Sequence, residues 1–281
     1  MAVPKIDAAE FSFEPSTLID VDRLLAALGA AGERIDVLAI SGCESTNAVL
    51  RDNFQKKSAR AALCVADRQT AGRGRRGRSW TSTPEGSLTF SLSWPFARGA
   101  GMSGLSLAIG LALRAGLADC GVKDVFLKWP NDLLVPAGGA YAKVGGILVE
   151  LAGDANGMGA VVGVGINLRS PVLDHLDQPA AGIDAVADVP ERHRLLAAIV
   201  VSLCRTLESF SRDGFAPLAS RWDASHVFHR REVMLHPEHG APLPGECLGV
   251  DADGALRVRT AAGVTRWLAG DVSLRAAERS A

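Results

Sequence analysis

The chain has 281 residues, of which 48% are hydrophobic and 22% charged, and its 30 basic and 31 acidic residues give a net charge of −1. This composition is typical of a globular protein of about two domains and argues against intrinsic disorder, a general nucleic-acid coat and a polybasic membrane anchor. The longest stretches without a formal charge, such as Gly99–Leu113, are shorter than the roughly 20 residues of a membrane-spanning helix.

The N-terminal residues and the cysteines indicate where the protein works. Met1–Phe13 contains acidic residues and lacks the apolar core of a secretory signal. The cysteines are odd in number, widely scattered and never paired as Cys-x-x-Cys: Cys43, Cys64, Cys120, Cys204 and Cys247. This pattern is typical of reduced, mostly buried thiols in a cytoplasmic protein. Four histidines come close together, but in a segment predicted as a domain junction rather than a metal site: His226, His229, His236 and His239.

In chain order, the first part of the sequence predicts a short helix, a strand, a capped helix and a second strand: Val21–Leu28, Ile35–Ile40, Ser45–Asn53 and Ala61–Ala66. In Ser87–Trp94 small polar residues alternate with apolar ones, which predicts a half-buried strand. Ser103–Cys120 predicts a long helix because apolar residues recur at four-residue spacing and Gly121 follows as a stop.

The second part predicts four strands and a long helix: Val125–Trp129, Leu133–Val135, Val144–Leu151, Ala160–Ile166 and Glu191–Ser209. Because strands cluster between helices without strict βαβ alternation, the main body is predicted to be α+β. From Arg231 onward, short apolar runs are separated by Pro, Gly and Asp turns, which predicts a small antiparallel barrel: Glu232–Leu235, Glu246–Val250, Ala255–Arg259 and Val264–Leu268. We therefore divide the chain into an N-terminal extension (1–34), a main domain (35–229) and a barrel (230–281).

The strongest local signal is the segment Gln69–Trp80. Five arginines and no acidic residue lie between Arg68 and Arg78. The glycines of the segment let the backbone approach a ligand closely, and the arginine fork suits carboxylate and phosphate oxygens. A solvated basic loop or a nucleic-acid-binding tail has a similar composition. The segment is short, lies inside a folded body and ends in a large apolar tryptophan, which favours an anion-binding loop.

Three further segments carry groups that suit an anionic substrate. In Lys128–Asp132 a proline stops a strand, and the oxygens of the following Asn-Asp pair suit a phosphate-bound cation or an incoming amine. In Lys143–Glu150 a lysine precedes two glycines and a buried strand. In Gly163–Asn167 glycines within a strand mark close backbone approach, and Asn167 suits a base edge or a ribose. Taken singly, these segments also fit a strand-ending turn, a solvent-facing lysine and an incomplete dinucleotide motif.

In this order and spacing, and with Cys43–Asn47 before them, the four segments resemble the biotin protein ligases. The resemblance extends from Ile35 to the closing Trp267–Arg275. It implies a class II synthetase-like α+β domain, with a mixed sheet flanked by helices, and a small C-terminal antiparallel β-barrel of the Src-homology-3 type. It also implies an ATP-dependent ligase that uses biotin, ATP and Mg²⁺. Such an enzyme forms biotinyl-5′-AMP, releases pyrophosphate and transfers biotin to a lysine of a biotin carboxyl-carrier domain.

The resemblance implies a role for each matching residue. Biotin is expected to contact Ser45, Thr46, Asn47, Gln69, Gly72, Arg73, Gly74, Arg75, Lys143 and Gly146. ATP is expected to contact Arg75, Arg78, Trp80, Lys128, Asn131, Lys143, Asn167 and Arg275. The expected catalytic residues are Lys143, Arg75 and Asp132, and the expected metal ligands are Asn131 and Asp132.

The sequence departs from the family pattern in two places. Tyr141-Ala142 precede Lys143 where relatives often have a basic residue, and Pro136–Ala140 forms a Gly-rich insert, so the entrance for acceptor or nucleotide differs in shape. Some relatives carry an N-terminal helix-turn-helix and act as repressors, whereas only 34 residues precede Ile35 here. We therefore expect a cytoplasmic ligase, monomeric or homodimeric, that binds neither DNA nor membranes.

Three other functions are compatible with parts of the sequence. A lipoate or octanoate ligase of the same superfamily is disfavoured by the Arg/Gly loop ending in Trp80. An Arg/Gly nucleic-acid-binding module would bind without ATP and weaken steeply with salt. A biotin-binding protein without catalysis is disfavoured by Lys143 and by the Lys128–Asp132 segment.

Overall fold

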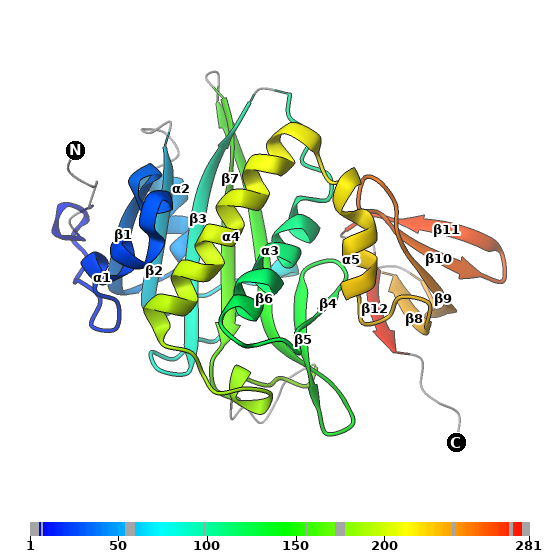
Figure 1. Ribbon diagram of the computed structural model, residues 1–281. Coiled ribbons are helices and arrows are strands. Elements are labelled where there is room, and N and C mark those ends of the chain that lie inside the picture. Colours follow the sequence, from blue (N-terminus) through cyan, green and yellow to red (C-terminus); the bar gives the residue numbers. More distant parts are fainter. Residues whose placement is uncertain are drawn as a thin grey trace.

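A seven-stranded mixed sheet forms the body of the molecule in the computed structural model (Figure 1). The structure describes residues 6, 8–53, 60–97, 99–154, 157–171, 178–237, 240–269 and 272–276. The strands follow the order β1 (Ile35–Cys43), β2 (Ala61–Gln69), β3 (Ser87–Phe96), β7 (Gly157–Asn167), β6 (Ala140–Asp154), β5 (Asp132–Ala137) and β4 (Phe126–Lys128). Only β1 and β2 pair in parallel; the other neighbours are antiparallel. The predicted α+β class with a mixed sheet is confirmed.

Helices cover both faces of this sheet. Three of them, α1 (Val21–Leu28), α3 (Leu105–Asp119) and α4 (Arg192–Asp213), pack together on one face (Figure 1). The short α2 (Thr46–Asn53) packs on β2, β3 and β7 from the other side. Alternate residues of β1 therefore enter two different apolar cores, with Val37 on the α3 side and Leu38 on the α2 side.

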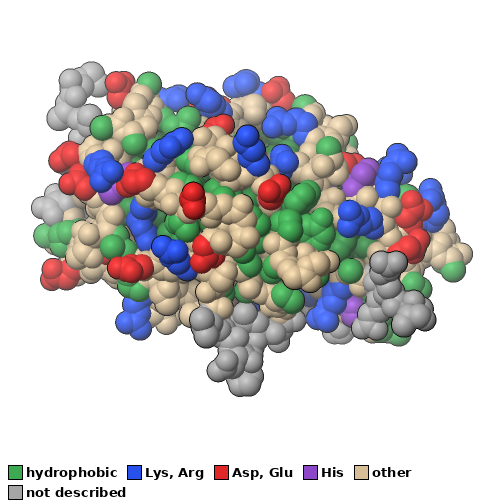
Figure 2. All heavy atoms as spheres, turned by 60° about the horizontal axis from the view of Figure 1, so that its bottom comes forward, with side chains coloured by type: hydrophobic (Ala, Val, Ile, Leu, Met, Phe, Trp, Pro, Cys, Tyr) green, Lys and Arg blue, Asp and Glu red, His purple; other side chains and the backbone are tan. Residues whose placement is uncertain are grey.

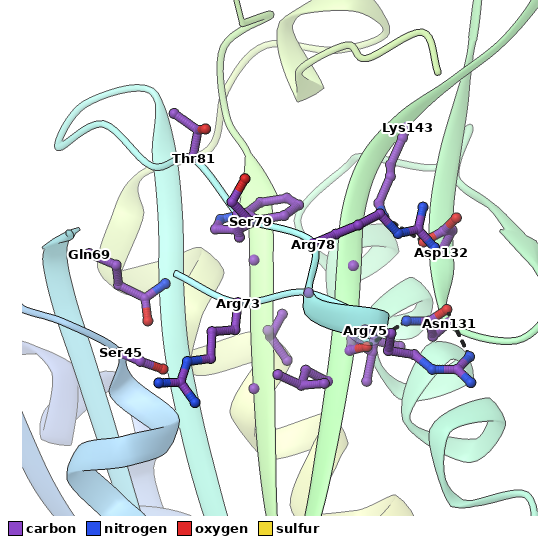
Figure 3. Close-up of a pocket in the computed structure, with 18 of the residues that line it drawn as sticks. Ser45, Gln69, Arg73, Arg75, Arg78, Ser79, Thr81, Asn131, Asp132 and Lys143 are labelled. Carbon is purple, nitrogen blue, oxygen red and sulfur yellow. Dashed lines mark hydrogen bonds and ion pairs between the residues drawn. The ribbon is translucent and has the colours of Figure 1, made fainter. Parts of the chain in front are cut away.

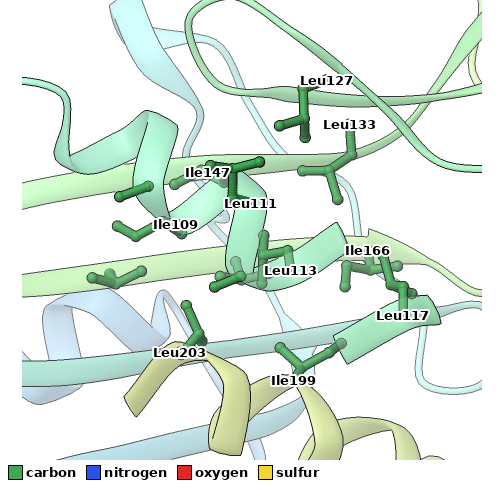
Figure 4. Close-up of a cluster of buried hydrophobic side chains, with 14 of the residues drawn as sticks. Ile109, Leu111, Leu113, Leu117, Leu127, Leu133, Ile147, Ile166, Ile199 and Leu203 are labelled. Carbon is green, nitrogen blue, oxygen red and sulfur yellow. The ribbon is translucent and has the colours of Figure 1, made fainter. Parts of the chain in front are cut away.

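The larger core lies between the helix pair α3–α4 and the strands. Ile109 and Leu113 of α3 meet Ile199 of α4 and side chains of β6 and β7 (Figure 4). The two helices cross so closely at Gly116 that a Cβ there would lie 2.6 Å from the Cα of Ile199. This rigid layer supports the strands whose opposite face carries the polar residues discussed below.

The polar positions of β3 are buried, so the prediction of a half-buried strand is wrong. Every residue from Ser87 to Ser93 is buried. The polar side chains avoid an unsatisfied state through hydrogen bonds: Thr89 Oγ1 donates to the Ala66 carbonyl (3.1 Å), and Ser93 Oγ accepts from the Ala62 N–H (3.0 Å). The alternation is therefore that of an interior strand covered on both faces, with one face polar.

The N-terminal residues lie along the outer edge of β1. Ile6 N–H donates to the Val37 carbonyl (3.2 Å), and Ser41 N–H donates to the Glu14 carbonyl (2.9 Å). The buried carboxylate of Asp67 on β2 accepts hydrogen bonds from Ser16 and Thr17. These contacts cover the edge strand, which would otherwise offer unpaired backbone groups to another chain.

A second, antiparallel sheet forms the C-terminal part. Its strands follow the order β11 (Gly263–Trp267), β10 (Leu256–Thr260), β9 (Leu243–Val250), β8 (Glu232–Pro237) and β12 (Val272–Ala276). This agrees with the predicted small barrel, and β12 adds a strand that the sequence patterns did not predict. A short helix, α5 (Ala219–Ser225), leads into it. Residues 270 and 271 of the closing motif, and His239, lie outside the described residues.

The surface carries charges of both signs. On the face seen in Figure 2, Lys and Arg side chains are interspersed with Asp and Glu side chains. Across the described part of the chain, no helix is long and apolar enough to cross a membrane.

The two sheets meet at a buried junction that contains His226. Its ring stacks on Trp222 (4.5 Å between ring centres), and its Nε2 atom is buried and has no hydrogen-bond partner in the described part of the chain. Its backbone lies beside β4, where Val227 N–H donates to the Leu127 carbonyl (2.9 Å). Burial lowers the pKa of His226 to about 3, and the nearby charges of His229 and Lys128 add to the effect.

We expect this histidine to make the protein less stable in mild acid. Below a pH of about 6.5 the unfolded chain binds a proton at this residue that the folded protein excludes, so the free energy of unfolding falls by roughly 2 kcal/mol between pH 6.5 and pH 5. His226→Phe should flatten this part of the pH profile in urea unfolding. His236→Phe, at a half-buried position of β8, is the control. An unchanged slope in the His226 variant would contradict the assignment.

Candidate active site

A cavity of about 750 Å³ opens on the α2 side of the large sheet (Figure 3). Its volume lies within the range of about 300–1,000 Å³ that is usual for small-molecule sites. It is bounded by the start of α2, the loop between β2 and β3, the facing parts of β5, β6 and β7, and the segment after β7. The lining residues include Ser45, Thr46, Asn47, Gln69, Arg73, Gly74, Arg75, Arg78, Trp80, Asn131, Asp132, Lys143, Gly146, Gly163, Gly165 and Asn167.

The Arg/Gly loop is folded back on itself at the cavity mouth. Trp80 N–H donates to the Gly72 carbonyl (2.8 Å), and Gly74 N–H donates to the Arg78 carbonyl (2.7 Å). A Cβ at position 72 would lie 2.4 Å from the Trp80 carbonyl oxygen, so only glycine permits this closure. In the view of Figure 3, Arg73 extends toward Ser45, Arg75 toward Asn131, and Arg78 toward Lys143 and Asp132.

The cavity is strongly cationic. Arg73, Arg75, Arg78 and Lys143 line it, and Asp132 is the one carboxylate among its described lining residues. Lys143 Nζ lies 2.6 Å from Asp132 Oδ1, and Lys128 Nζ lies 3.9 Å from Asp132 Oδ2.

The pKa values of Arg75 and Lys128 are lowered in part by repulsion from neighbouring cations. Burial lowers the pKa of the Arg75 guanidinium, and repulsion by Arg76 and Arg78 adds to the effect, with Asp132 opposing it. Burial also lowers the pKa of Lys128; the charge of Asp132 opposes this shift, and Lys143, Arg275 and Arg78 add to it. A bound anion would relieve this repulsion, so the cavity suits a carboxylate or a phosphate.

Two glycines of β7 make room for large side chains. A Cβ at Gly165 would lie 2.3 Å from Trp80 Cε2, and a Cβ at Gly163 would lie 2.3 Å from Asn47 Oδ1. The indole of Trp80 therefore lies flat against the backbone of β7, and its Nε1 atom is buried with no hydrogen-bond partner among the residues that the structure describes. It forms an apolar wall beside the cations, suited to a flat aromatic ligand.

The opposite wall is polar and uncharged. Thr46 N–H donates to Gln69 Oε1 (2.8 Å), and the Thr46 hydroxyl lies 2.7 Å from Ser91 Oγ. Asn47 Nδ2 donates to Glu150 Oε2 (2.7 Å). Ser91 and Glu150 do not line the cavity but hold the residues that do.

Comparison with known proteins agrees with this geometry. Residues 40–167 match the biotin/lipoate A/B protein ligase family, and residues 240–275 match the biotin protein ligase C terminal domain. The chain is 35% identical over 269 residues to the bifunctional ligase/repressor BirA of Salmonella typhimurium, which covers 94% of this chain and 81% of that protein. The chain belongs to the biotin protein ligase family. It is therefore a ligase, as its sequence predicts.

Two other members of the biotin protein ligase family are similar to most of the chain. The biotin–[acetyl-CoA-carboxylase] ligase of Paracoccus denitrificans is 34% identical over 72% of this chain and 86% of its own. The biotin protein ligase of Aquifex aeolicus, solved in complex with biotin and ATP, superposes with a TM-score of 0.73 and 27% identity, over 87% of this chain and 99% of that one. The two-domain architecture is thus that of a family in which biotin and ATP occupy one enzyme.

Most of the residues predicted for the site come together in the cavity. Three do not line it: Gly72, which closes the Arg/Gly loop from behind, Lys128 and Arg275. Lys128 Nζ lies 3.4 Å from the Oε1 of Gln178, a lining residue, and Arg275 on β12 is exposed and close enough to affect Lys128. Lining residues that the sequence did not single out include Ser79, Thr81, Ile147, Leu148, Pro171, Gln178 and Ala180.

The donor set does not fit a metal ion held by the protein alone. Asp132 is already paired with Lys143, and Asn131 Oδ1 accepts from Arg75 (3.5 Å). Among the described residues, no group of three His, Cys, Asp or Glu side chains is placed to hold a metal. The expectation that Asn131 and Asp132 bind Mg²⁺ stays a prediction.

Proposed function

We propose that this ligase activates biotin with ATP and transfers it to a lysine of a biotin carboxyl-carrier domain, and that the cavity residues carry both steps. The observation that carries this assignment of roles is the composition of the cavity. One space contains a cluster of cations, an uncharged polar wall and an aromatic wall. Biotin presents a carboxylate and a polar ureido ring, and ATP presents phosphates and a flat base.

The polar wall is suited to the ureido ring of biotin. Ser45, Thr46 and Gln69 offer hydroxyl and amide groups at the start of α2 and the end of β2. Because the Oε1 atom of Gln69 is held by Thr46, its amide nitrogen is left as a donor for the ring carbonyl. Arg73 and Arg75 follow along the chain, which places cationic groups for the carboxylate of the same ligand.

The cationic cluster and Trp80 are suited to the nucleotide. The Nζ atom of Lys143 lies 3.3 Å from the Cβ position of Gly146, and the ring of Trp80 lies 3.8 Å from that same position. A phosphate bound by Lys143 and Arg78 would therefore lie next to the indole. Asn167 is buried at the end of β7, where its Nδ2 donates to the Ala181 carbonyl (3.2 Å), leaving its Oδ1 atom for the adenine amino group.

The chemistry follows from these positions. A carboxylate oxygen of biotin attacks the α-phosphorus, the bond to the β-phosphate breaks, and pyrophosphate leaves with the electron pair. Lys143, Arg75 and Arg78 stabilise the negative charge that develops on the phosphate oxygens. In the second step a neutral lysine amine attacks the acyl carbonyl, the bond from that carbon to the phosphate oxygen breaks, AMP leaves with the electron pair, and the attacking nitrogen loses a proton to solvent. Asp132 is placed to bind that amine once Lys143 turns toward the phosphate.

The proposed acceptor is a lysine of a carboxylase carrier domain, and the name of the Paracoccus denitrificans relative gives acetyl-CoA carboxylase as the substrate of that enzyme. The five cysteines are unpaired, which favours a reducing compartment such as the cytoplasm. The decisive assay is transfer of labelled biotin to a carrier domain, with and without MgATP, in competition with lipoate. Label that appears on the carrier only with MgATP, and that excess lipoate does not displace, supports the proposal; acylation by lipoate instead would overturn it.

Arg75→Ala should let the intermediate escape. Arg75 comes from the loop that covers the cavity and donates to Asn131 on its far side (3.5 Å), so it ties the loop across the opening. Without it, biotinyl-AMP should dissociate and hydrolyse before transfer, because the closed loop excludes water. Rapid gel filtration after a single turnover should recover less enzyme-bound biotinyl-AMP. Arg60→Ala, an exposed arginine paired with Asp36, is the matched control. Equal retention in the Arg75 variant would refute this role.

A further inference from the structure

A chain of hydrogen bonds leads from the cavity wall into the interior of the sheet. It starts at the hydroxyl of Thr46, passes through Ser91 Oγ (2.7 Å) and Asn47 Oδ1 (2.6 Å from Ser91), and ends at the carboxylate of Glu150 (2.7 Å from Asn47 Nδ2). Thr46, Ser91 and Asn47 are each at most 4% exposed, so water does not compete for these bonds. Arg51 pairs with the other carboxylate oxygen of Glu150 (3.2 Å).

The orientation of the Asn47 amide is fixed by Glu150. A carboxylate oxygen only accepts hydrogen bonds, so the group that faces it at 2.7 Å is the NH₂ of Asn47. The amide oxygen then faces Ser91. Gly163 of β7 holds the amide in place from behind, since a Cβ at that position would lie 2.3 Å from Asn47 Oδ1.

The position of every proton in the chain follows from this orientation. An amide oxygen cannot donate, so the single hydroxyl proton of Ser91 points at Asn47. The 2.7 Å contact between the two hydroxyls then needs the proton of Thr46. Gln69 Oε1 is a second, longer acceptor for the Thr46 hydroxyl (3.1 Å), but it is already bound by the Thr46 N–H (2.8 Å), so the shorter contact with Ser91 takes the proton. Thr46 therefore presents only lone pairs to the cavity.

We propose that Ser91 and Glu150 are positioning residues that fix the Thr46 hydroxyl as a hydrogen-bond acceptor and so make the site select a ligand ring with an N–H at that point. Neither residue lines the cavity. Their effect on a ligand passes through the proton positions of Asn47 and Thr46. This inference rests on the proposed contact between Thr46 and the ureido ring, and it adds the reason why a ring oxygen in place of the N–H is rejected.

The test compares biotin with its two carbamate isosteres, in each of which one ring N–H is replaced by oxygen. Dissociation constants are measured without ATP. We expect the unmodified protein to prefer biotin over at least one isostere by about 100-fold, because a ring oxygen would face a lone pair with no proton between them. Ser91→Ala frees the Thr46 proton to turn toward a ring oxygen, so the preference should fall to about tenfold or less.

Glu150→Gln is a second variant with a side chain of the same shape. Because Glu150 is only partly buried, whereas Ser91 is fully buried, this substitution threatens folding less. The neutral amide accepts either orientation of Asn47, so the chain can reverse and the preference should again fall. Asp52→Asn is the matched control, because Asp52 also pairs with Arg51 (3.2 Å); it should keep the full preference. A lowered ratio in both variants, with thermal unfolding showing that they fold, supports the proposal.

Two other results would overturn the proposal, and they can be told apart. If the variants weaken biotin and the isosteres by the same factor, Ser91 and Glu150 only support packing, and the proposed biotin contact stands. If the unmodified protein does not distinguish the isosteres from biotin, or binds none of them, the proposed placement of the ureido ring at Thr46 is itself wrong. Should Ser91→Ala not fold, the ratio in Glu150→Gln alone decides.

Discussion

Lys143→Ala should slow pyrophosphate release in a single turnover by about 10²–10³-fold and change the dissociation constant of biotin much less. The reacting carboxylate and the α-phosphate are both anions, and the repulsion between them rises as they meet. Lys143 lines the cavity at Gly146, beside Arg78 and next to the ring of Trp80, where its ammonium would face a phosphate bound as proposed. Its contribution is largest in the transition state, so the rate falls more than the affinity.

In the structure Lys143 is paired with Asp132. Asp132 holds the ammonium at 2.6 Å inside the cavity until a bound phosphate draws it away. Lys143→Arg keeps the charge but replaces a point charge by a planar fork, so it should restore only part of the rate. Lys123→Ala, at an exposed position before β4, is the control for losing one positive charge. Pyrophosphate release at the unmodified rate in Lys143→Ala would remove this residue from the mechanism.

Local patterns in the sequence predicted much of the fold. The spacing of apolar residues located all three helices that pack on the α3 side, and α1 spans Val21–Leu28 as predicted. It also located the seven strands of the mixed sheet and four of the five strands of the barrel. In these elements apolar residues recur at regular spacing, and burial of those residues against the core determines which structure the segment adopts. The seven-residue α5 and the five-residue β12 were not predicted.

The predicted site residues came from loops and strand ends whose composition is unusual by itself. What the sequence does not contain is the partner of each residue. The two glycines of β7 signalled close approach, but only the fold shows that Asn47 fills the space at Gly163 and Trp80 the space at Gly165. Likewise the backbone N–H of Lys143 donates to the Pro179 carbonyl, and the Lys143 carbonyl accepts from the Ala181 N–H. These partners are far from Lys143 in sequence, so no local pattern predicts them.

The buried polar face of β3 shows the same limit. A serine that alternates with leucine has the same pattern whether it faces water or a second layer. Ser91 became part of the site because α2 covers it and supplies Thr46 and Asn47 as partners. The alternation of polar and apolar residues predicted the strand correctly, but the exposure of its polar face wrongly. That face is buried by α2, a helix about 40 residues away in sequence.

Gly165→Ala should raise the KM for ATP by about tenfold to 100-fold, with a smaller effect on biotin. The added Cβ would lie 2.3 Å from Cε2, 2.5 Å from Cζ2 and 2.7 Å from Nε1 of Trp80. Backbone on one side and the loop on the other leave the indole no flexible end that can give way, so the ring must leave its place on β7. Stacking of a base on an aromatic side chain is worth about 1–3 kcal/mol, which sets the size of the expected loss.

Three variants separate the loss of the aromatic wall from general damage to the sheet. Gly42→Ala makes the same change in β1, where the new Cβ would find 3.5 Å to its nearest neighbour, so stability and KM should stay near their original values. Gly165→Ala alone should lower the free energy of unfolding by about 1–3 kcal/mol. Adding Trp80→Leu removes the clash and should restore stability while the KM for ATP stays high. If the double variant recovers both stability and ATP affinity, Trp80 does not form part of the nucleotide site.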